Sequence, residues 1–294
     1  MDMVTWVNGR LVSADEPVLS AADRGFTVGD GVFETMPVMR GQAFALTRHL
    51  ARLRRSVDGL RLSMSDGDFA ALRSGVDDTL VAYTSAFDEQ PGRLRITVSA
   101  GVGPLGPARV DAPLTMTIGA APNPAPAAAG GAPAGARCIR SPYVRNERSA
   151  VVGLKTISYA EHAVALAHAR AAGADEALLA NTRGELCEGT GSNVLVELGG
   201  ELLTPPLDSG CLPGVTRDLV LEWGAAAGLP IREQALDFSV LDEVAQGRAH
   251  LALTSSLRGA QPVVWLDGAE ITPGPLTAAL AALYVERSGE LIDP

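Results

Sequence analysis

The sequence predicts a two-domain protein of α+β and α/β character, with a small N-terminal α+β domain and a larger C-terminal domain built on a mixed sheet. Three observations favour this fold class. The chain has 294 residues, which is long for one compact core. Strand-like and helix-like patterns are grouped in its first part and alternate in its second part. Between these parts, residues 122–136 are dominated by Pro, Gly and Ala and carry no charge.

The first part begins with a hairpin signal, because Asn8-Gly9 separates two short β-like runs and suits a tight turn. A second hairpin is expected around Arg40-Gly41, followed by two amphipathic helices and two further strands. The predicted elements are strands over 4–7, 10–12, 33–39, 43–46, 93–99 and 114–119, and helices over 48–60 and 66–85.

The second part is expected to alternate strands and helices. The predicted strands cover 137–141, 175–180, 193–198, 230–234 and 249–254, and the predicted helices cover 159–172, 215–226 and 275–287. The expected domains are therefore residues 1–122 and 137–294, joined by a linker over 123–136.

Composition excludes several classes of protein. A net charge of -10 argues against nucleic-acid binding, because no basic stripe is present to neutralise phosphates. The three cysteines are widely spaced, so neither a disulfide framework nor a metal site is indicated. The N-terminus shows no signal peptide, and apolar runs are too short to span a membrane. We therefore expect a cytoplasmic protein that binds no metal, nucleic acid or membrane.

Two glycine motifs resemble nucleotide-binding loops but fail on their context. Gly153-Leu154-Lys155-Thr156 lacks the glycine that a phosphate-binding P-loop needs upstream, where Ser149 stands instead. Residues 101–106 match GxGxxG, but Pro104 and Pro107 disfavour the helix that should begin there. We expect residues 101–106 to form a tight loop.

Lys155 is the only lysine among the 24 Lys and Arg residues of the chain. Arginine keeps its proton in proteins, whereas a lysine amine can lose its proton and form an imine with an aldehyde. A lysine retained in so arginine-rich a sequence is therefore a candidate for covalent chemistry, with a chance surface lysine as the alternative.

Other segments supply candidate ligands for an anion. Glu188 begins a glycine-rich turn over 188–193, and Gly214-Val215-Thr216 precedes an amphipathic helix whose first N–H groups can bind phosphate. Hydroxyls follow the strand that ends near Thr254, and Arg52 offers a planar guanidinium. Each of these segments also has a purely structural interpretation, as a turn, a helix cap, the end of a strand or a solvated charge. Together with Lys155 they suit pyridoxal 5'-phosphate, PLP.

These residues occur in motifs that resemble the class IV aminotransferases, the fold-type IV PLP enzymes with the D-amino-acid aminotransferase-like fold. The resemblance extends from Asp23-Arg24-Gly25 and Gly29-Asp30-Gly31-Val32-Phe33-Glu34 to Ser256-Leu257. It implies a homodimer that acts on a small amino substrate.

The resemblance also implies roles for individual residues. Lys155 would hold the cofactor as an imine and then move protons, and Glu188 would face the pyridine nitrogen. Tyr159 would lie near the ring oxygen and Leu212 on the ring face. The phosphate would be bound by Arg52, Val215, Thr216 and Ser256, with Leu257 adjoining it.

Two positions depart from the family pattern. Val28 replaces an aromatic residue, and Ser158 stands where Asn is frequent. Both departures bear on the substrate more than on the cofactor. Arg145, Arg148 and Arg258 are candidates for binding substrate carboxylates, with a structural or surface role as the alternative for each.

Residues 155–161 and 255–259 look most like those of 4-amino-4-deoxychorismate lyases, which serve folate biosynthesis. A transaminase of branched-chain or D-amino acids is the second reading. A third is a protein that binds PLP without turnover.

Overall fold

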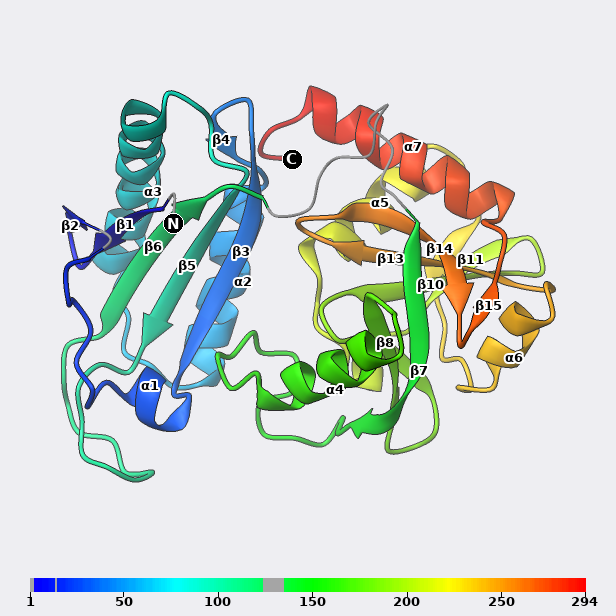
Figure 1. Cartoon of the computed structure of the whole chain (residues 1–294), viewed down its shortest axis with the longest axis horizontal. Helices are drawn as coiled ribbons and strands as arrows, with labels where there is room; N and C mark the ends of the chain where they lie inside the picture. The colour runs from blue at the N-terminus through cyan, green and yellow to red at the C-terminus, as the bar shows by residue number, and fades with distance from the viewer. Residues whose placement is uncertain (1–2, 14, 124–134) are drawn as a thin grey trace. The chain divides into compact units, whose positions relative to one another are not determined.

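The computed structural model describes residues 3–13, 15–123 and 135–294 (Figure 1). The chain divides into two compact units. The first comprises Met1–Pro126, Leu154–Tyr159 and Ile292–Pro294, and the second comprises Ala127–Gly153 and Ala160–Leu291. The sequence expectation of one continuous domain on each side of a linker differs from this division, because residues 154–159 belong to the first unit. Residues 124–134 of the expected linker lie outside the described residues.

The first unit contains a six-stranded antiparallel sheet with the strand order β2-β1-β6-β5-β3-β4. Its strands are β1 (Val4–Val7), β2 (Arg10–Val12), β3 (Gly31–Met39), β4 (Gln42–Ala43), β5 (Arg93–Ser99) and β6 (Thr115–Ala121). Its helices are α1 (Arg24–Val28), α2 (Leu46–Gly59) and α3 (Asp66–Phe87).

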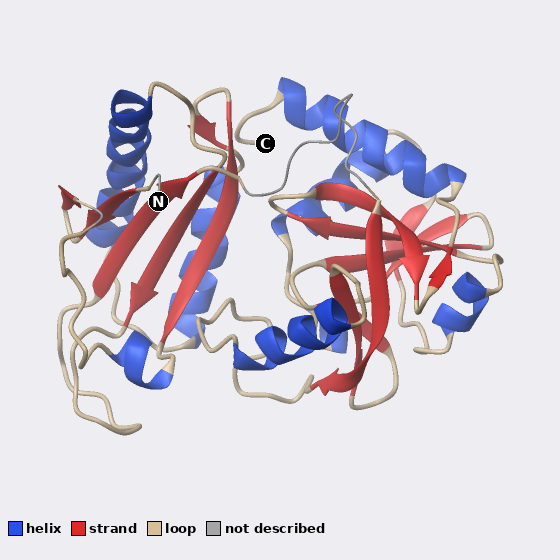
Figure 2. Cartoon of the chain, in the orientation of Figure 1, coloured by secondary structure: helices blue, strands red, loops and turns tan. Residues whose placement is uncertain are grey.

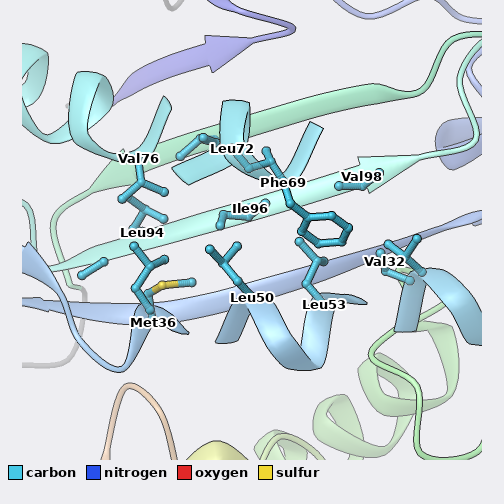
Figure 3. Close-up of a cluster of buried hydrophobic side chains, with 14 of the residues drawn as sticks. Val32, Met36, Leu50, Leu53, Phe69, Leu72, Val76, Leu94, Ile96 and Val98 are labelled. Atoms are coloured by element: carbon cyan, nitrogen blue, oxygen red, sulfur yellow. The ribbon is translucent and has the colours of Figure 1, made fainter. Parts of the chain in front are cut away.

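Helices α2 and α3 pack on one face of this sheet, as Figure 2 shows. Strand residues alternate between the two faces, so every second side chain of β3 and β5 points toward the helices. Figure 3 shows the resulting core, where Val32 and Met36 of β3 meet Ile96 of β5 and Leu53 of α2, all with no exposed surface. The same alternation leaves Phe33 on the face of β3 that the helices do not cover.

The predicted elements of this unit are confirmed with small changes. Asn8 and Gly9 have positive φ angles of 44° and 96°, as a tight hairpin turn requires. The fourth strand is shorter than the predicted 43–46, because Ala45 adopts a left-handed conformation and α2 begins at Leu46. Helix α1 was not predicted, since five residues are too few for a periodic signal.

The second unit is built on a nine-stranded mixed sheet with the order β12-β11-β10-β13-β14-β7-β8-β9, and β15 pairs with β14. Its strands are β7 (Ala136–Arg145), β8 (Glu176–Asn181), β9 (Leu186–Gly189), β10 (Asn193–Leu198), β11 (Glu201–Thr204), β12 (Ile231–Glu233), β13 (His250–Ser255), β14 (Gly259–Leu266) and β15 (Ala269–Glu270). Its helices are α4 (Ala160–Ala171), the 3-10 turn η1 (Leu207–Ser209), α5 (Val215–Ala226), α6 (Val240–Ala245) and α7 (Pro275–Glu290).

All eight elements predicted for this part of the chain are present. Helix α5 has the predicted bounds, and α7 is three residues longer than predicted. Strand β7 begins at Ala136, inside the expected linker, and continues to Arg145. Strands β9, β11, β14 and β15 were not predicted, and neither were the 3-10 turn η1 and helix α6. Pro262 lies within β14 and weakens its strand signal.

Among the described residues, we find no helix that is both long and apolar enough to cross a membrane. The cytoplasmic location stays a prediction.

Candidate functional site

Lys155 lies in a short segment that is fastened to β3 and α2 of the first unit. The Phe33 N–H donates to the Lys155 carbonyl at 2.9 Å, and the Ile157 N–H donates to the Gly31 carbonyl at 2.9 Å. The Lys155 N–H donates to the Ser56 hydroxyl of α2 at 3.1 Å. These bonds fix the backbone of the only lysine against one strand and one helix.

Aromatic rings surround the Lys155 amine. Its Nζ lies 4.3 Å from the ring centroid of Phe33 and 5.8 Å from that of Tyr159. These two rings meet edge to face, with centroids 5.3 Å apart. Arg95 stacks on Phe33 with its guanidinium carbon 3.8 Å from the centroid, and burial lowers the pKa of Arg95. The amine is therefore held against aromatic faces, with a cation nearby.

Arg52 takes part in a fully buried charge cluster with two residues that the sequence analysis gave no role. Its Nε and Nη2 donate to the two carboxylate oxygens of Glu34 at 2.8 and 2.6 Å. The His49 Nδ1 lies 2.6 Å from Glu34 Oε2. Burial alone would raise the pKa of Glu34, but Arg52 and His49 together lower it to about 2. Burial lowers the pKa of His49, so the cluster is a carboxylate paired with a guanidinium beside a neutral imidazole.

Glu188 lies at the end of β9 in the second unit and is held from two directions. Its Oε2 accepts the Leu212 N–H at 2.8 Å, and its Oε1 lies 3.3 Å from the Arg145 Nε. The Glu188 side chain is only 6% exposed. The Leu212 carbonyl accepts from the Asn193 side chain at 2.8 Å. Both contacts of Glu188 stabilise its negative charge and fix its direction.

The start of α5 is suited to an anion. Gly214 precedes the helix, and no side chain caps the first turn. A Cβ at Gly214 would lie 2.0 Å from the Asn193 side-chain oxygen, so a larger residue there would displace the Asn193 side chain. Asn193 pairs across the sheet with Thr254 and follows Ser192 in the chain. The hydroxyls of Thr254 and Ser192 are buried and find no hydrogen-bond partner within the described ranges. Unsatisfied buried hydroxyls are costly unless a ligand binds them.

The remaining predicted phosphate ligands lie on the same unit. Val215 and Thr216 form the first turn of α5 and are buried, and Ser256 and Leu257 follow the end of β13. The Thr216 side chain hydrogen-bonds to Tyr284, whose pKa burial raises to about 12. Thr216 is therefore already engaged by the protein.

The three arginines considered for substrate carboxylates have different surroundings. Arg145 pairs with Glu188 and approaches Glu161 at 3.8 Å. Arg258 pairs with Glu176, which also accepts the Gly191 N–H at 2.8 Å. Through Glu176, Arg258 therefore connects the segment after β13 to the turn after β9. Arg148 is exposed.

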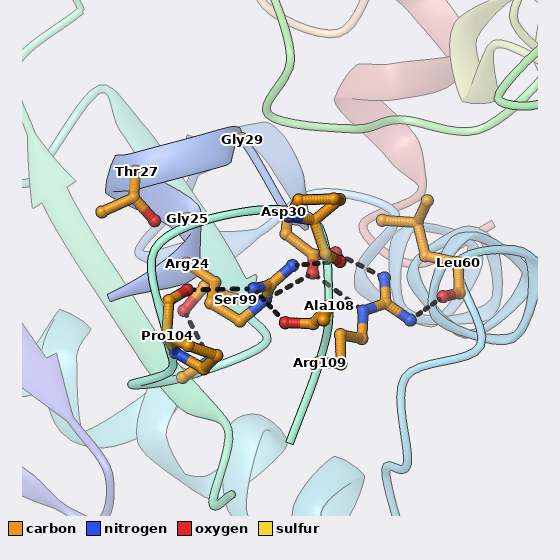
Figure 4. Close-up of polar contacts among 12 residues, drawn as sticks. Arg24, Gly25, Thr27, Gly29, Asp30, Leu60, Ser99, Pro104, Ala108 and Arg109 are labelled. Atoms are coloured by element: carbon orange, nitrogen blue, oxygen red, sulfur yellow. Dashed lines mark hydrogen bonds and ion pairs between the residues drawn. The ribbon is translucent and has the colours of Figure 1, made fainter. Parts of the chain in front are cut away.

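The segment with the GxGxxG pattern, residues 101–106, is confirmed as a tight loop. The Arg24 side chain hydrogen-bonds to this loop and to the residues that follow it. Arg24 donates to the carbonyls of Gly106 at 2.9 Å and Ala108 at 2.8 Å (Figure 4). Asp30 holds both Arg24 and Arg109. Gly101 has a φ of 72°, and a Cβ added at this position would lie 2.0 Å from the Pro113 carbonyl oxygen. Both the backbone conformation and the close packing therefore require glycine there.

Glu34, His49 and Arg95 were not among the predicted site residues, although the position of Glu34 in its strand was a signal in the sequence. Glu34 occupies an inward position of β3 between the apolar residues Val32 and Met36. A charged residue at a core-facing position of a strand indicates a buried partner of opposite charge, because an unpaired charge is unfavourable in the core. No comparable signal identifies Arg95, because its stacking on Phe33 depends on the register of β3 and β5.

Comparison with known proteins identifies the family. The model of the family described as amino-transferase class IV matches residues 31–265. The chain belongs to this family. Members depend on PLP, and the protein is therefore a PLP-dependent enzyme.

Three relatives illustrate the range of named activities. A D-alanine aminotransferase of Bacillus licheniformis is 31% identical, over 92% of this chain and 92% of its own. A bifunctional aminodeoxychorismate lyase / D-amino acid transaminase of Mycobacterium tuberculosis is 29% identical, over 96% and 97%. The PLP-bound form of a hypothetical aminotransferase from Mycobacterium tuberculosis is 27% identical, with a TM-score of 0.80 over 97% and 98% of the two chains. The fold is fold-type IV, and at these identities the relatives leave the specific activity open.

The pairing of Glu34 predicts acid sensitivity. Its pKa is lowered from 4.5 to about 2 in the folded protein, so the unfolded chain binds a proton that the folded one does not. The contribution of Glu34 to the unfolding free energy is therefore complete above about pH 5 and is lost as the pH falls toward 2. The loss should be on the order of 3 kcal/mol, measured by denaturant titration at a series of pH values. The variant Glu34→Gln cannot titrate and should show a flatter profile in this window. An unchanged profile would contradict the assignment.

Proposed function

We propose that the protein is a 4-amino-4-deoxychorismate lyase, which converts its substrate to 4-aminobenzoate and pyruvate. The PLP chemistry is supported by one observation above all, the single lysine fixed by β3 and α2 with its amine against Phe33 and Tyr159. The choice of lyase is supported by the likeness of residues 155–161 and 255–259 to lyase sequences. A relative named both as a lyase and as a transaminase agrees with it.

A transaminase of D-amino or branched-chain amino acids is the second candidate. It is favoured by the D-alanine aminotransferase of Bacillus licheniformis, which matches over nearly the whole chain. The two reactions share the removal of a proton beside the substrate nitrogen and differ in what leaves afterwards.

The described residues fit PLP. The chain offers an amine on Lys155, a buried carboxylate on Glu188, and a helix start with uncapped N–H groups and unsatisfied hydroxyls nearby. When bound, PLP supplies an aldehyde for the amine and an electron-withdrawing ring that acidifies the carbon beside the substrate nitrogen.

Each residue has a proposed task. Lys155 would hold the cofactor through its amine, and the same amine, when free, would move the proton beside the substrate nitrogen. Glu188 would face the pyridine nitrogen and hold its proton, and Arg145 with the Leu212 N–H fixes the direction of that carboxylate. Tyr159 would lie beside the ring oxygen of PLP, and Leu212 would cover the face of the ring.

The proposed phosphate ligands are Arg52, the N–H groups of Val215 and Thr216, the hydroxyl of Ser256, and the adjoining Leu257. Because Thr216 is bonded to Tyr284, we assign its N–H to the phosphate before its hydroxyl. The buried hydroxyls of Ser192 and Thr254 add donors in the same part of the second unit.

The role of Lys155 is tested by reduction with borohydride. The PLP-loaded protein should retain a pyridoxyl group on the peptide that spans Gly153 to Tyr159, detected by mass spectrometry after digestion. Lys155→Arg should carry no tag and lose at least about three orders of magnitude in rate, since arginine cannot form the imine. A variant with normal turnover would rule out the mechanism.

The lyase assignment is tested by the need for an amino acceptor. Purified protein with PLP and aminodeoxychorismate should release pyruvate and 4-aminobenzoate in equal amounts without any 2-oxo acid. The ring loses one proton and the enolpyruvyl group and becomes aromatic, and the departing enol takes up one proton to become pyruvate, so the step needs no oxidant and no acceptor. Turnover only when 2-oxoglutarate is added would favour the transaminase. If the protein binds PLP but shows neither activity, the third alternative is favoured, a protein that binds PLP without turnover.

We also propose a homodimer, as the family resemblance implies. Large apolar side chains support it, since Phe26 of α1 is 79% exposed and Leu105 is 84% exposed. A partner that covered these two side chains would remove their apolar surface from water. Light scattering should give twice the mass of one chain, and a single-chain mass at micromolar concentration would contradict the proposal.

A further inference from the structure

Among the acidic residues that the structure describes in the first unit, Glu34 is the most completely buried, and no step of the proposed reaction uses it. Its side chain has no exposed surface and projects from the helix-facing side of β3. A carboxylate in such a place is unfavourable unless every oxygen has a strong donor. Arg52 and His49 supply those donors, and both are also buried.

The contact between Glu34 and Arg52 has two parallel hydrogen bonds, at 2.8 and 2.6 Å. A pair of this kind fixes both the position and the plane of the guanidinium, which a single bond would leave free to rotate. The His49 Nδ1, at 2.6 Å from the carboxylate, in turn limits how the carboxylate can rotate. The direction of the Arg52 fork is therefore set by residues on α2 and β3.

The same two elements also position Lys155. Glu34 is next to Phe33 on β3, and the Phe33 N–H bonds to the Lys155 carbonyl. Arg52 lies one helical turn before Ser56 on α2, and the Ser56 hydroxyl accepts the Lys155 N–H. The guanidinium and the reactive amine are thus anchored to one strand–helix pair, so their separation is fixed by the same packing.

From this arrangement we propose that Glu34 is a positioning residue for the cofactor phosphate. It holds the Arg52 guanidinium in the orientation that receives the phosphate, at a fixed distance from the Lys155 amine, and His49 steadies it. The inference rests on the proposed function, because it requires PLP at Arg52. The competing reading is that Arg52 is only the counter-ion of a structural carboxylate.

The two readings differ in their dependence on the phosphate group. Pyridoxal has the aldehyde and the ring of PLP but no phosphate, so binding of pyridoxal reports on Lys155 without Arg52. The measurement is the dissociation constant of each compound, from absorbance titration of the cofactor-free full-length protein. Unfolding temperatures of the same samples report on stability.

Glu34→Gln should weaken PLP binding by about tenfold or more, the loss of about one charge-assisted contact, while pyridoxal binding stays within about twofold. Asp30→Asn is the matched control. Asp30 is also a partly buried carboxylate of the first unit that pairs with arginines, Arg24 and Arg109, but it has no role in the proposed site. Its removal should leave the ratio of the two dissociation constants unchanged.

His49 provides a second test if Glu34→Gln does not fold. His49→Leu removes the contact to Glu34 and should shift the PLP-to-pyridoxal ratio in the same direction. His49→Asn keeps a donor near the position of Nδ1 and should restore part of the ratio.

The outcomes separate the claims. A change in the ratio for Glu34→Gln and His49→Leu but not for Asp30→Asn supports the proposal. Equal loss of both ligands, or no loss of PLP affinity, overturns it and leaves Glu34 with a structural role only. If the unaltered protein binds neither compound, the proposed function itself fails.

Discussion

The buried carboxylate of Glu34 is the constraint on which the first unit depends. It lies on the core side of β3, among residues that are otherwise apolar, and can remain there only while Arg52 and His49 of α2 face it. Helix α2 therefore cannot rotate or slide on the sheet without leaving a charge unpaired in the core. Because α2 and β3 also hold the backbone of Lys155, the elements that carry this ion pair also position the only lysine of the sequence.

The second unit uses two further glutamate–arginine pairs in a comparable way. Glu188 with Arg145 connects the end of β9 to the end of β7, and the Leu212 N–H joins the segment before α5 to the same carboxylate. Glu176 with Arg258 connects β8 to the segment after β13, and Glu176 also binds the turn at Gly191. In each case a buried charge lies where loops meet, and the segments before α5 and after β13 carry the predicted cofactor ligands Leu212, Ser256 and Leu257. Specific pairing of buried charges is an effective means of fixing the arrangement of loops that lack a regular hydrogen-bond ladder.

Much of the fold was predictable from the sequence, because it depends on local patterns. Helix α5 was predicted to the residue, since Pro213-Gly214 precedes a regular amphipathic pattern. Strand β14 was not predicted, because Gly259 and Pro262 interrupt its strand-like pattern. Its pairing with β13 and β7 depends on the tertiary arrangement of the sheet, which no local pattern specifies. Family and cofactor followed from motifs. The roles of the individual site residues stay predictions.

The partners of the charged residues were not predictable in the same way. Arg52 was selected for its chemistry, but its pairing with Glu34 requires α2 to lie on β3, and no local pattern specifies that contact. Arg258 was considered for a substrate carboxylate, and the structure shows it bound to Glu176 from a distant part of the chain. Charged side chains choose partners by tertiary packing, so sequence alone gives their chemistry and not their contacts.

The chain passes from one unit to the other more than once, because residues 154–159 and 292–294 belong to the unit formed mainly by the first 126 residues. A gene fragment that stops in the Pro/Gly/Ala stretch would encode β3 and α2, which hold the backbone of Lys155, but would not encode Lys155 itself. A fragment that starts after that stretch would encode the lysine without the strand and helix that hold it. The protein is therefore a poor candidate for division into separately expressed domains. A recombinant with a relative has to take residues 154–159 from the same parent as the first 126 residues.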